Sequence, residues 1–242
     1  MPVEIRFNTS IIPPTDPSSE IDPSIELFQQ SPFKFALQKS GELTDISLSI
    51  LEGVTRQSLR DLFPGTGRRL FSVIDNQIGV ASVRNKAICQ LVAQRSVDAG
   101  IVGLDQVYES GLKDELVILR ELRETNEWDL VLATPRTRRV SSIADILVVA
   151  TQYPLITQAF FLSMGHSPTI LQTHGSTEVM PLLKHSGRNI DGIVDLRVSG
   201  NTLEANGMQA WSPALAKVFP VLITNKQVIS DVAKKVYLEK FM

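Results

Sequence analysis

The sequence predicts an α/β protein whose sheets are mainly parallel. Short apolar runs rich in β-branched residues recur along the chain, each bounded by turn residues, as buried strands usually are. Stretches with a helical spacing of apolar residues separate most of these runs, and that alternation is typical of crossovers between parallel strands. The chain has 242 residues, which is enough for one large domain or two small ones.

Residues 1–32 differ in composition from the rest of the chain. Pro13, Pro14, Pro17 and Pro23 are interleaved with Ser, Asp and Glu. Because proline fixes the backbone and lacks an N–H donor, we expect an extended arm with at most one short helix, "PSIELFQQ". Contact with a partner is one role open to such an arm.

Regular elements are expected from "FKFALQ" onward. A helix is predicted over "RNKAICQLVAQRS", where Ile88, Leu91 and Val92 have helical spacing, and the short buried strand "AGIVG" follows it. Later strands are predicted in the runs "WDLVLATP", "DILVVAT", "PTILQT", "GIVDLRV" and "VFPVLITN". The final stretch, "KQVISDVAKKVYLEKF", is predicted to form one closing amphipathic helix.

Composition narrows the classes of function. The formal net charge is −2 and the pI is near 6, so no overall positive field favours a nucleic acid or an anionic membrane as partner. Cys89 is the single cysteine, which excludes an intrachain disulfide and a cysteine-clustered zinc site. Its apolar helical context predicts a buried thiol that packs. No secretion signal and no apolar run of about 18 residues occurs, so we expect a cytoplasmic protein.

The segment 191–207, "DGIVDLRVSGNTLEANG", is the first candidate ligand site. Its strand brings the chain to a carboxyl edge, where ligands bind in open α/β sheets. A small polar turn and a short helix with Gly207 as its C′ residue follow. Backbone N–H groups and hydroxyls in such a turn can bind a phosphate, and the nearby Asp195 can bind ribose hydroxyls or help to place a metal. From the pattern alone, an ordinary structural connection with Asp191 as a solvated charge is favoured.

Two further turns and several cations are weaker candidates. One strand ends at Gly103, and Asp105 is expected to cap the following helix. "THGSTEV" places a turn at a possible helix start, with Glu178 just inside the helix. Most surface arginines are solvated, and the cluster Arg136, Arg138 and Arg139 is predicted to be an exposed loop between two strands.

Five segments in register resemble one known family. "RNKAICQLVAQRSVDAGIVGLDQVYE" is similar to "RPQDIPxYVxxGxADLGIVGxDxxxE", "LVLATP" to "LxVAxP", "ATQYP" to "VATxYP" and "GSTEVMP" to "GSVExAP". The segment 191–207 is similar to the sugar-phosphate signature, approximately "DAIVDxVxTGxTLxANGL". All five patterns are those of ATP phosphoribosyltransferase, and the resemblance spans about residue 34 to the C-terminus.

The resemblance implies a fold and a reaction. The fold consists of two α/β lobes of the periplasmic-binding-protein type (type II), with the active site in the cleft between them. After the arm 1–32, the first lobe comprises 33–124 and 222–242, and 125–221 form the second lobe with the signature. The reaction joins N1 of the ATP adenine to C1′ of phosphoribosyl pyrophosphate and releases pyrophosphate with Mg²⁺ assistance, which is the first step of histidine biosynthesis.

The resemblance also implies site residues. Those that bind phosphoribosyl pyrophosphate are Asp191 and Asp195 at its ribose, and Ser199, Gly200, Asn201 and Thr202 at its 5′-phosphate. Further substrate contacts are implied at Gly103, Asp105, Gly175, Ser176 and Glu178. The residues at or near the family's positive positions, which would stabilise the pyrophosphate and ATP charges, are Lys39, Arg68, Arg69 and Arg84. No direct metal ligand is assigned, because Mg²⁺ is expected to bind through the pyrophosphate. No general base is assigned, because adenine N1 already has a lone pair.

Departures from the family pattern concern the acceptor. Where the family has "LPKGRL", this chain has "LQKSGEL", so Glu42 stands in place of an arginine and would repel a polyphosphate. Ala87 and Cys89 replace the Asp and the second Pro of "RPQDIP". Three alternatives therefore stay open: a paralogue with a different acceptor base, a weakly active subunit, and a non-catalytic two-lobed protein that binds small molecules.

The resemblance finally implies an assembly. The chain ends where the family's catalytic core ends, so we expect the short form, which lacks the C-terminal regulatory domain. A homo-oligomer, expected to be a dimer, is implied, together with a regulatory subunit that resembles histidyl-tRNA synthetase.

Overall fold

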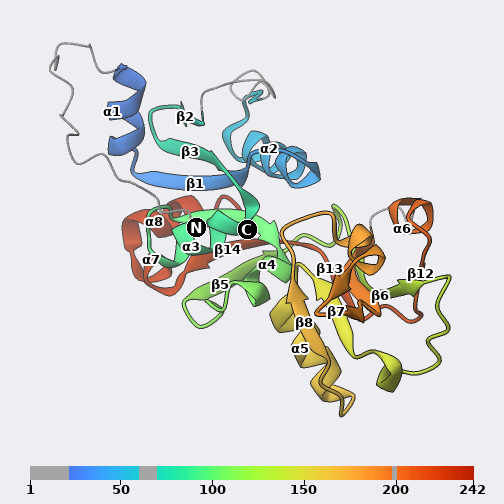
Figure 1. Ribbon diagram of the computed structural model, residues 1–242. Helices are drawn as coiled ribbons and strands as arrows, with labels where there is room; N and C mark the ends of the chain where they lie inside the picture. The colour runs from blue at the N-terminus through green and yellow to red at the C-terminus, as the bar shows by residue number, and fades with distance from the viewer. Residues whose placement is uncertain (1–21, 60–69, 198–200) are drawn as a thin grey trace, which may run out of the picture.

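The computed structural model describes residues 22–59, 70–197 and 201–242. In these residues the chain forms two α/β lobes, each built on its own mixed sheet (Figure 1). The α/β class and the two lobes are therefore confirmed. Within the described ranges, no helix is long and apolar enough to cross a membrane.

The sheet of the first lobe has the strand order β2-β3-β1-β4-β14-β5. In chain order, its strands are β1 (Phe33–Gln38), β2 (Phe71–Ile74), β3 (Ile78–Val83), β4 (Ala99–Gly103), β5 (Leu116–Glu121) and β14 (Pro220–Asn225). β1 is parallel to β3 and β4, whereas β2 is antiparallel to β3, and β14 is antiparallel to both β4 and β5.

The sheet of the second lobe has the order β12-β6-β11-β7-β8, and β13 also pairs with β6. Its strands are β6 (Trp128–Pro135), β7 (Val148–Thr151), β8 (Thr169–Gln172), β11 (Gly192–Arg197), β12 (Met208–Ala210) and β13 (Ala216–Val218). β11, β7 and β8 are parallel, and β6 is antiparallel to β11, β12 and β13. A small separate hairpin consists of β9 (Lys184–His185) and β10 (Arg188–Asn189).

Each sheet contains three neighbouring parallel strands, β3-β1-β4 or β11-β7-β8, but the remaining strands pair in antiparallel fashion. The prediction of mainly parallel sheets is wrong for those remaining strands. The chain crosses between the lobes after β5 and again between Val218 and Pro220. Each crossing delivers a strand, β6 or β14, that starts at the junction, and Pro220 accordingly pairs with Gly103 at the end of β4. Such a strand must run opposite to the parallel strands, because those end at the junction.

Helices cover the sheets. They are α1 (Pro23–Gln30), α2 (Glu42–Thr55), α3 (Asn85–Ala93), α4 (Leu104–Glu109), α5 (Pro154–Ser163), α6 (Asn201–Ala205), α7 (Lys226–Ser230) and α8 (Val232–Leu238), with the 3₁₀ helices η2 (Ile143–Asp145) and η3 (Thr177–Leu182). The predicted helix "PSIELFQQ" is confirmed as α1, whereas the single closing helix is wrong. Asp231 separates α7 from α8 because its side chain accepts hydrogen bonds from the N–H groups of Ala233 and Lys234, which caps a new helix.

β1 has a different helix on each of its faces. Phe33 and Phe35 pack in one apolar cluster with Leu51 of α2, while Ala36 packs in a second cluster with Cys89 of α3. This alternation follows from the two-residue period of a strand. Cys89 is buried as predicted, and burial raises the pKa of its thiol to about 12, so it packs as a neutral group.

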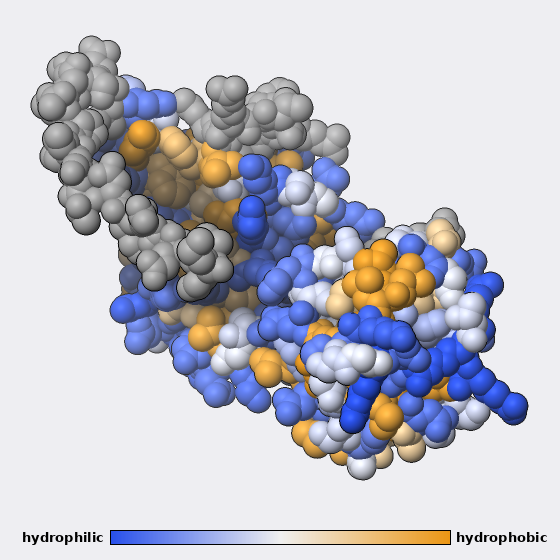
Figure 2. All heavy atoms as spheres, viewed as in Figure 1, coloured by the Kyte–Doolittle hydropathy of each residue, from blue (hydrophilic) through white to orange (hydrophobic). Residues whose placement is uncertain are grey.

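The carboxyl ends of the parallel strands in both sheets face the junction between the lobes. β1, β3 and β4 end there in the first lobe, and β7 and β11 end there in the second lobe, where Arg197 pairs with Asp129 near the start of β6. Hydrophilic side chains lie along this junction on the face shown in Figure 2. Because ligands of open α/β sheets bind outside such strand ends, we place the candidate site there.

Candidate ligand site at the junction of the lobes

Asp195 lies near the carboxyl end of β11, beside two residues of η3. Burial is the main cause that raises the pKa of its carboxyl group to about 6, and the charge of Glu178 adds to this effect. Hydrogen bonds from the N–H of Leu196 and the hydroxyl of Thr177 act in the opposite direction. The structure therefore brings together the two predicted site residues Asp195 and Glu178, and their carboxylates form a local negative centre.

The turn that carries Glu178 has an unusual backbone. Gly175 has φ +139° and Ser176 has φ +50°, so both lie in the left-handed region. Thr177, which is fully buried, then starts η3, and its hydroxyl lies 3.0 Å from the hydroxyl of Thr173. This turn holds Glu178 beside β11.

Thr151 fixes the end of the neighbouring strand β7. Its hydroxyl donates to the carbonyl of Val194 at 2.7 Å and accepts from the N–H of Tyr153 at 2.9 Å. The "ATQYP" motif thus ties β7 to the residue before Asp195 and to the start of α5. The strand ends are held in register by a buried side chain rather than by backbone pairing alone.

The phosphate turn is described in part. The predicted contacts Ser199 and Gly200 lie outside the described residues, as does the side chain of Asn201. Thr202 is exposed in the first turn of α6. Gly207 has φ +69° and donates to the carbonyl of Glu204 at 3.0 Å, which confirms the predicted glycine beyond the end of α6.

Asp191 does not face a ligand position. Only 2% of it is exposed, and one carboxylate oxygen accepts hydrogen bonds from the N–H groups of Leu147 and Val148 at 2.7 and 2.9 Å. The other oxygen pairs with the guanidinium group of Arg138. Asp191 precedes β11 at its amino end, away from the junction, so the solvated charge is wrong and this position gives no support to the ribose contact.

Two predicted cations are neighbours in the first lobe. The N–H of Lys39, just after β1, donates to the carbonyl of Val83 at 2.8 Å, and Arg84 follows at once. Lys39 and Arg84 are both exposed at this carboxyl edge, whereas Arg68 and Arg69 lie outside the described residues. Two buried oxygens here, Oε1 of Gln38 and Oδ1 of Asn85, have no hydrogen-bond partner in the described part of the chain. The edge therefore offers two exposed cations, Lys39 and Arg84, to a ligand.

Asp105 does not cap α4. The N-cap residue is Gly103, which makes no side-chain cap, and the carboxylate of Asp105 lies back over it. A Cβ at Gly103 would be 2.1 Å from Oδ1 of Asp105, so any other residue there would displace this carboxylate. Burial is the main cause that raises the pKa of Asp105, whose carboxylate accepts a hydrogen bond from Nε2 of Gln106 at 2.6 Å.

Glu109, which joins the two lobes, and Tyr153, which lies near it, were not predicted from the sequence. Glu109, in α4, accepts hydrogen bonds from the N–H groups of Ile156 and Leu155 at 2.7 and 3.1 Å and thereby caps α5 of the other lobe. Burial, followed by the charges of Asp105, Asp195 and Glu109, raises the pKa of Tyr153. Glu109 ends the family pattern "GxDxxxE", but its partner is 46 or 47 residues away in sequence and no local signal reveals it.

The carboxylate of Glu42 is hydrogen-bonded to the segment that connects the lobes. Its Oε2 accepts hydrogen bonds from Nδ2 of Asn126 at 2.8 Å and from Nε1 of Trp128 at 3.2 Å. Both partners lie in the crossing that leads into β6. Both donors are uncharged, so these hydrogen bonds hold the crossing in place but bring no opposite charge to Glu42, and its repulsion of a polyphosphate stays a prediction.

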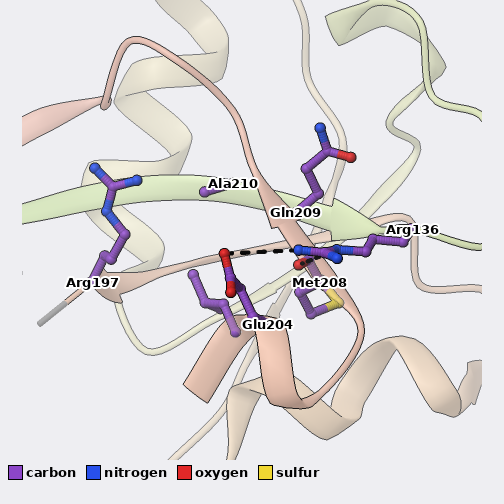
Figure 3. Close-up of a pocket in the computed structure, with 7 residues that line it drawn as sticks. Arg136, Arg197, Glu204, Met208, Gln209 and Ala210 are labelled. Atoms are coloured by element: carbon purple, nitrogen blue, oxygen red, sulfur yellow. Dashed lines mark hydrogen bonds and ion pairs between the residues drawn. The ribbon is translucent and has the colours of Figure 1, made fainter. Parts of the chain in front are cut away.

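A polar cavity of about 720 Å³ lies beside α6 (Figure 3). Arg136 donates to the carbonyl of Met208 at 3.3 Å and lies 3.8 Å from a carboxylate oxygen of Glu204, while Arg197 lines the cavity further along. Arg136 and Arg139 are exposed in the loop after β6, as predicted, whereas Arg138 is only partly exposed because it pairs with Asp191. Arg197 was not identified from the sequence, although it stands inside the signature segment.

The comparisons with known proteins decide the family. A family model described as ATP phosphoribosyltransferase matches residues 84–241. The chain belongs to this family. The matched range includes Arg84, Asp105, Glu178 and Asp195, whereas Lys39 lies before it.

Archaeal members of the family are longer than this chain. The chain is 33% identical over 185 residues to the ATP phosphoribosyltransferase of Natronomonas pharaonis and 29% identical over 205 residues to that of Methanocaldococcus jannaschii. These matches cover 75% and 83% of this chain, and 62% and 67% of the two relatives. The chain thus spans about two thirds of the length of these relatives or slightly less.

Solved structures show the fold. The "ATP phosphoribosyl transferase (HisG:HisZ) complex from Thermotoga maritima" matches with a TM-score of 0.67 at 22% identity, over 86% of this chain and 96% of that chain. A Candida albicans protein with the generic periplasmic binding protein fold matches with a TM-score of 0.53 at 11% identity, over 86% of this chain and 67% of that chain. The periplasmic-binding-protein-like type of fold is confirmed.

Proposed function

We propose that this chain transfers the phosphoribosyl group of phosphoribosyl pyrophosphate to N1 of the ATP adenine, with release of pyrophosphate, as the first step of histidine biosynthesis. Membership of the ATP phosphoribosyltransferase family over residues 84–241 carries the proposal. The position of Asp195 on β11, just before the signature turn and α6, supports it, because a carboxylate beside a phosphate turn suits a ribose phosphate.

The donor side of the site would act through Asp195 and Glu178. With a pKa of about 6, Asp195 is largely ionised at neutral pH and can accept hydrogen bonds from the ribose hydroxyls. Ribosyl transfer develops positive charge on the sugar, and two fixed carboxylates stabilise that charge more in the transition state than in the ground state. The same pair contributes less to binding the uncharged ground-state sugar.

The leaving-group side would act through Lys39 and Arg84 of the first lobe. Both are exposed at the carboxyl edge, where they can pair with pyrophosphate oxygens without losing an existing ion pair of the described residues. Their role is to position the leaving group and offset its charge. Closing the two lobes on the donor would bring these cations towards the sugar held by the second lobe.

Mg²⁺ would bind in this site mainly through the pyrophosphate of the donor substrate. Within the described ranges, no group of three or more His, Cys, Asp or Glu side chains is placed to hold a metal ion. Mg²⁺ is commonly bound by one or two carboxylates together with substrate phosphates, so Asp195 and Glu178 are the hard oxygen donors that would assist the pyrophosphate. The ion, when bound, would stabilise the negative charge of the departing group.

The acceptor is proposed to be ATP, as the family to which the chain belongs implies. Glu42, which stands in place of the family's arginine, accepts hydrogen bonds from Asn126 and Trp128 in the crossing between the lobes. We also propose a homo-oligomer and a separate regulatory subunit. The Thermotoga maritima complex named above supports the subunit, because it is an assembly of two kinds of chain.

The proposal is tested by direct assay. Incubation of the chain with ATP, phosphoribosyl pyrophosphate and Mg²⁺, with and without a subunit resembling histidyl-tRNA synthetase, should yield phosphoribosyl-ATP. Donor binding without product in both conditions would indicate a different acceptor or an inactive subunit. Absence of both product and donor binding would contradict the function and leave the non-catalytic binding protein.

A further inference from the structure

A second cavity opens where α4 of the first lobe meets α5 of the second. It has a volume of about 590 Å³, and both lobes contribute to its lining. The apolar part comes from Leu104 and Tyr108 on α4, from Leu155, Ile156 and Ala159 on α5, and from Val218 on β13. We call this cavity the α4–α5 pocket. A well-formed apolar hollow with a few polar groups is the usual form of a small-molecule site.

The apolar wall of the α4–α5 pocket is open to solvent. Tyr108 is 55% exposed and Leu155 is 47% exposed, although both are large apolar side chains beside buried neighbours. Covering them with an apolar body would remove that surface from water and so favour binding. Its volume lies within the range of sites for small organic molecules, so an apolar ring system is small enough to enter.

The charged residues of the pocket determine where an anionic group of such a ligand would lie. Lys217 at the rim is already paired with Asp129 at 2.7 Å and Glu127 at 3.4 Å. Lys113, also at the rim, is exposed and has no ion pair within the described part of the chain. Asp105 lines the inner part, so an anionic group is disfavoured there and favoured beside Lys113.

The pocket adjoins the contact that joins the lobes. Leu155 and Ile156, whose side chains line it, are the residues whose N–H groups donate to Glu109 across the junction. A ligand that touches both walls binds this arrangement of the lobes better than one in which α4 and α5 have separated. It must therefore raise the population of the described arrangement.

We propose that the α4–α5 pocket binds an amphipathic small molecule with an apolar body and one anionic group, and that such a ligand holds α4 against α5. The site shares Asp105 with the implied substrate contacts, but it differs from the donor site at Asp195 and Glu178 in its apolar lining, and it does not depend on the proposed reaction. Its ligand class is an organic carboxylate or sulfonate with a ring system, rather than a sugar phosphate.

Anilinonaphthalene sulfonate is a suitable fluorescent probe, and uncharged N-phenylnaphthylamine is its matched control. We expect saturable binding of one sulfonate per chain and weaker binding of the uncharged probe. Ala159→Trp should fill the pocket and weaken sulfonate binding at least about tenfold, whereas Gln158→Trp, on the same helix but outside the lining, should leave it unchanged. Lys113→Gln, at an exposed position that folding does not need, should weaken it about fivefold.

Two further measurements distinguish binding in this pocket from binding at the donor site or at a contact between two copies of the chain. Sulfonate at ten times its dissociation constant should slow hydrogen exchange of the Leu155 and Ile156 amides about tenfold in the unsubstituted protein, but not in Ala159→Trp. Saturating phosphoribosyl pyrophosphate should not displace the probe. Displacement by the donor, equal binding to Ala159→Trp and Gln158→Trp, or a change of oligomeric state in Ala159→Trp alone would overturn the proposal. The last result would show that a second copy of the chain covers the pocket.

Discussion

β11 has an aspartate at each end, and the two have different surroundings. Asp191, just before the strand, is almost fully buried and its two oxygens are occupied by Leu147 N–H, Val148 N–H and Arg138. Asp195, near the other end, lies at the junction of the lobes beside Glu178, with a pKa raised by burial to about 6. In the folded protein the carboxylate of Asp191 has hydrogen-bond and ion-pair partners. The carboxylate of Asp195 is buried beside a second carboxylate, which disfavours its charged form.

The difference shows how one strand serves both stability and chemistry. A carboxylate that accepts two backbone hydrogen bonds and pairs with an arginine stabilises the connection that leads into β7. A carboxylate held beside a second one costs stability when both are ionised, and such sites are typical of places where a ligand or a metal supplies the missing positive charge. Family resemblance alone assigned the same role to both residues.

The largest expected effect concerns the amino end of β11. Asp191→Asn should lower the free energy of unfolding by about 2–4 kcal/mol, because two backbone N–H groups and Arg138 lose a charged acceptor. Urea unfolding followed by circular dichroism measures this loss. A change below about 1 kcal/mol would contradict the structural role of Asp191.

The carboxyl end should show the opposite pattern. Asp195→Asn should lower kcat/KM about 100-fold, through loss of a charge that stabilises the reacting sugar, while the fold stays intact. Steady-state formation of phosphoribosyl-ATP measures the effect, with Asp191→Asn, assayed well below its unfolding midpoint, as the matched control on the same strand. If Asp191→Asn loses as much kcat/KM as Asp195→Asn, the two ends do not differ in function.

A pH series would sharpen the contrast. Because folding raises the pKa of Asp195 to about 6, the folded chain binds more protons there than the unfolded chain, and this group makes stability fall as pH rises from about 4 to about 6. Asp195→Asn should remove that part of the slope and be more stable than the unsubstituted protein at pH 7, by about 1–2 kcal/mol. Urea midpoints across this range report it, and an unchanged slope in the variant would show that Asp195 is not the group responsible.

The smallest expected effect concerns the partner of Asp191. Arg138 is 36% exposed, so Arg138→Gln should cost only about 1 kcal/mol, less than Asp191→Asn, since the two backbone hydrogen bonds remain. Chemical unfolding of the two single variants and the double variant gives the coupling energy between the residues. A cost for Arg138→Gln equal to that of Asp191→Asn would show that the ion pair, rather than the backbone contacts, gives Asp191 its role.

Local signals in the sequence predicted the elements well. β6 was expected at "WDLVLATP" and α1 at "PSIELFQQ", and both match the observed bounds because short β-branched runs and a proline at a helix start act locally. The break at Asp231 was not predicted, since the apolar spacing continues through it and only the cap geometry reveals two helices. The antiparallel direction of β6 and β14 was also not predicted. The path of the chain between the lobes sets that direction, and no local pattern reveals it.

The candidate site was predictable to the extent that the family motifs mark it. The signature located Asp195, and the "GSTEVMP" motif located Glu178, but neither gave a reason to separate Asp191 from Asp195, since burial and distant partners distinguish them. The partners of Glu42 were not predicted, and Glu109 was not identified at all. Both bind residues on the other side of the junction, and such contacts exist only once the two lobes have assembled.

Calorimetric titration of phosphoribosyl pyrophosphate would show directly which end of β11 binds the donor. The titration compares the unsubstituted protein, Asp195→Asn and Asp191→Asn, each with Mg²⁺ and under conditions where all three are folded. We expect Asp195→Asn to weaken donor binding at least about tenfold, which is about 1.4 kcal/mol, while Asp191→Asn binds as the unsubstituted protein does. Equal affinity of Asp195→Asn and the unsubstituted protein, or selective weakening in Asp191→Asn, would contradict the assignment of the donor site to the carboxyl end of β11.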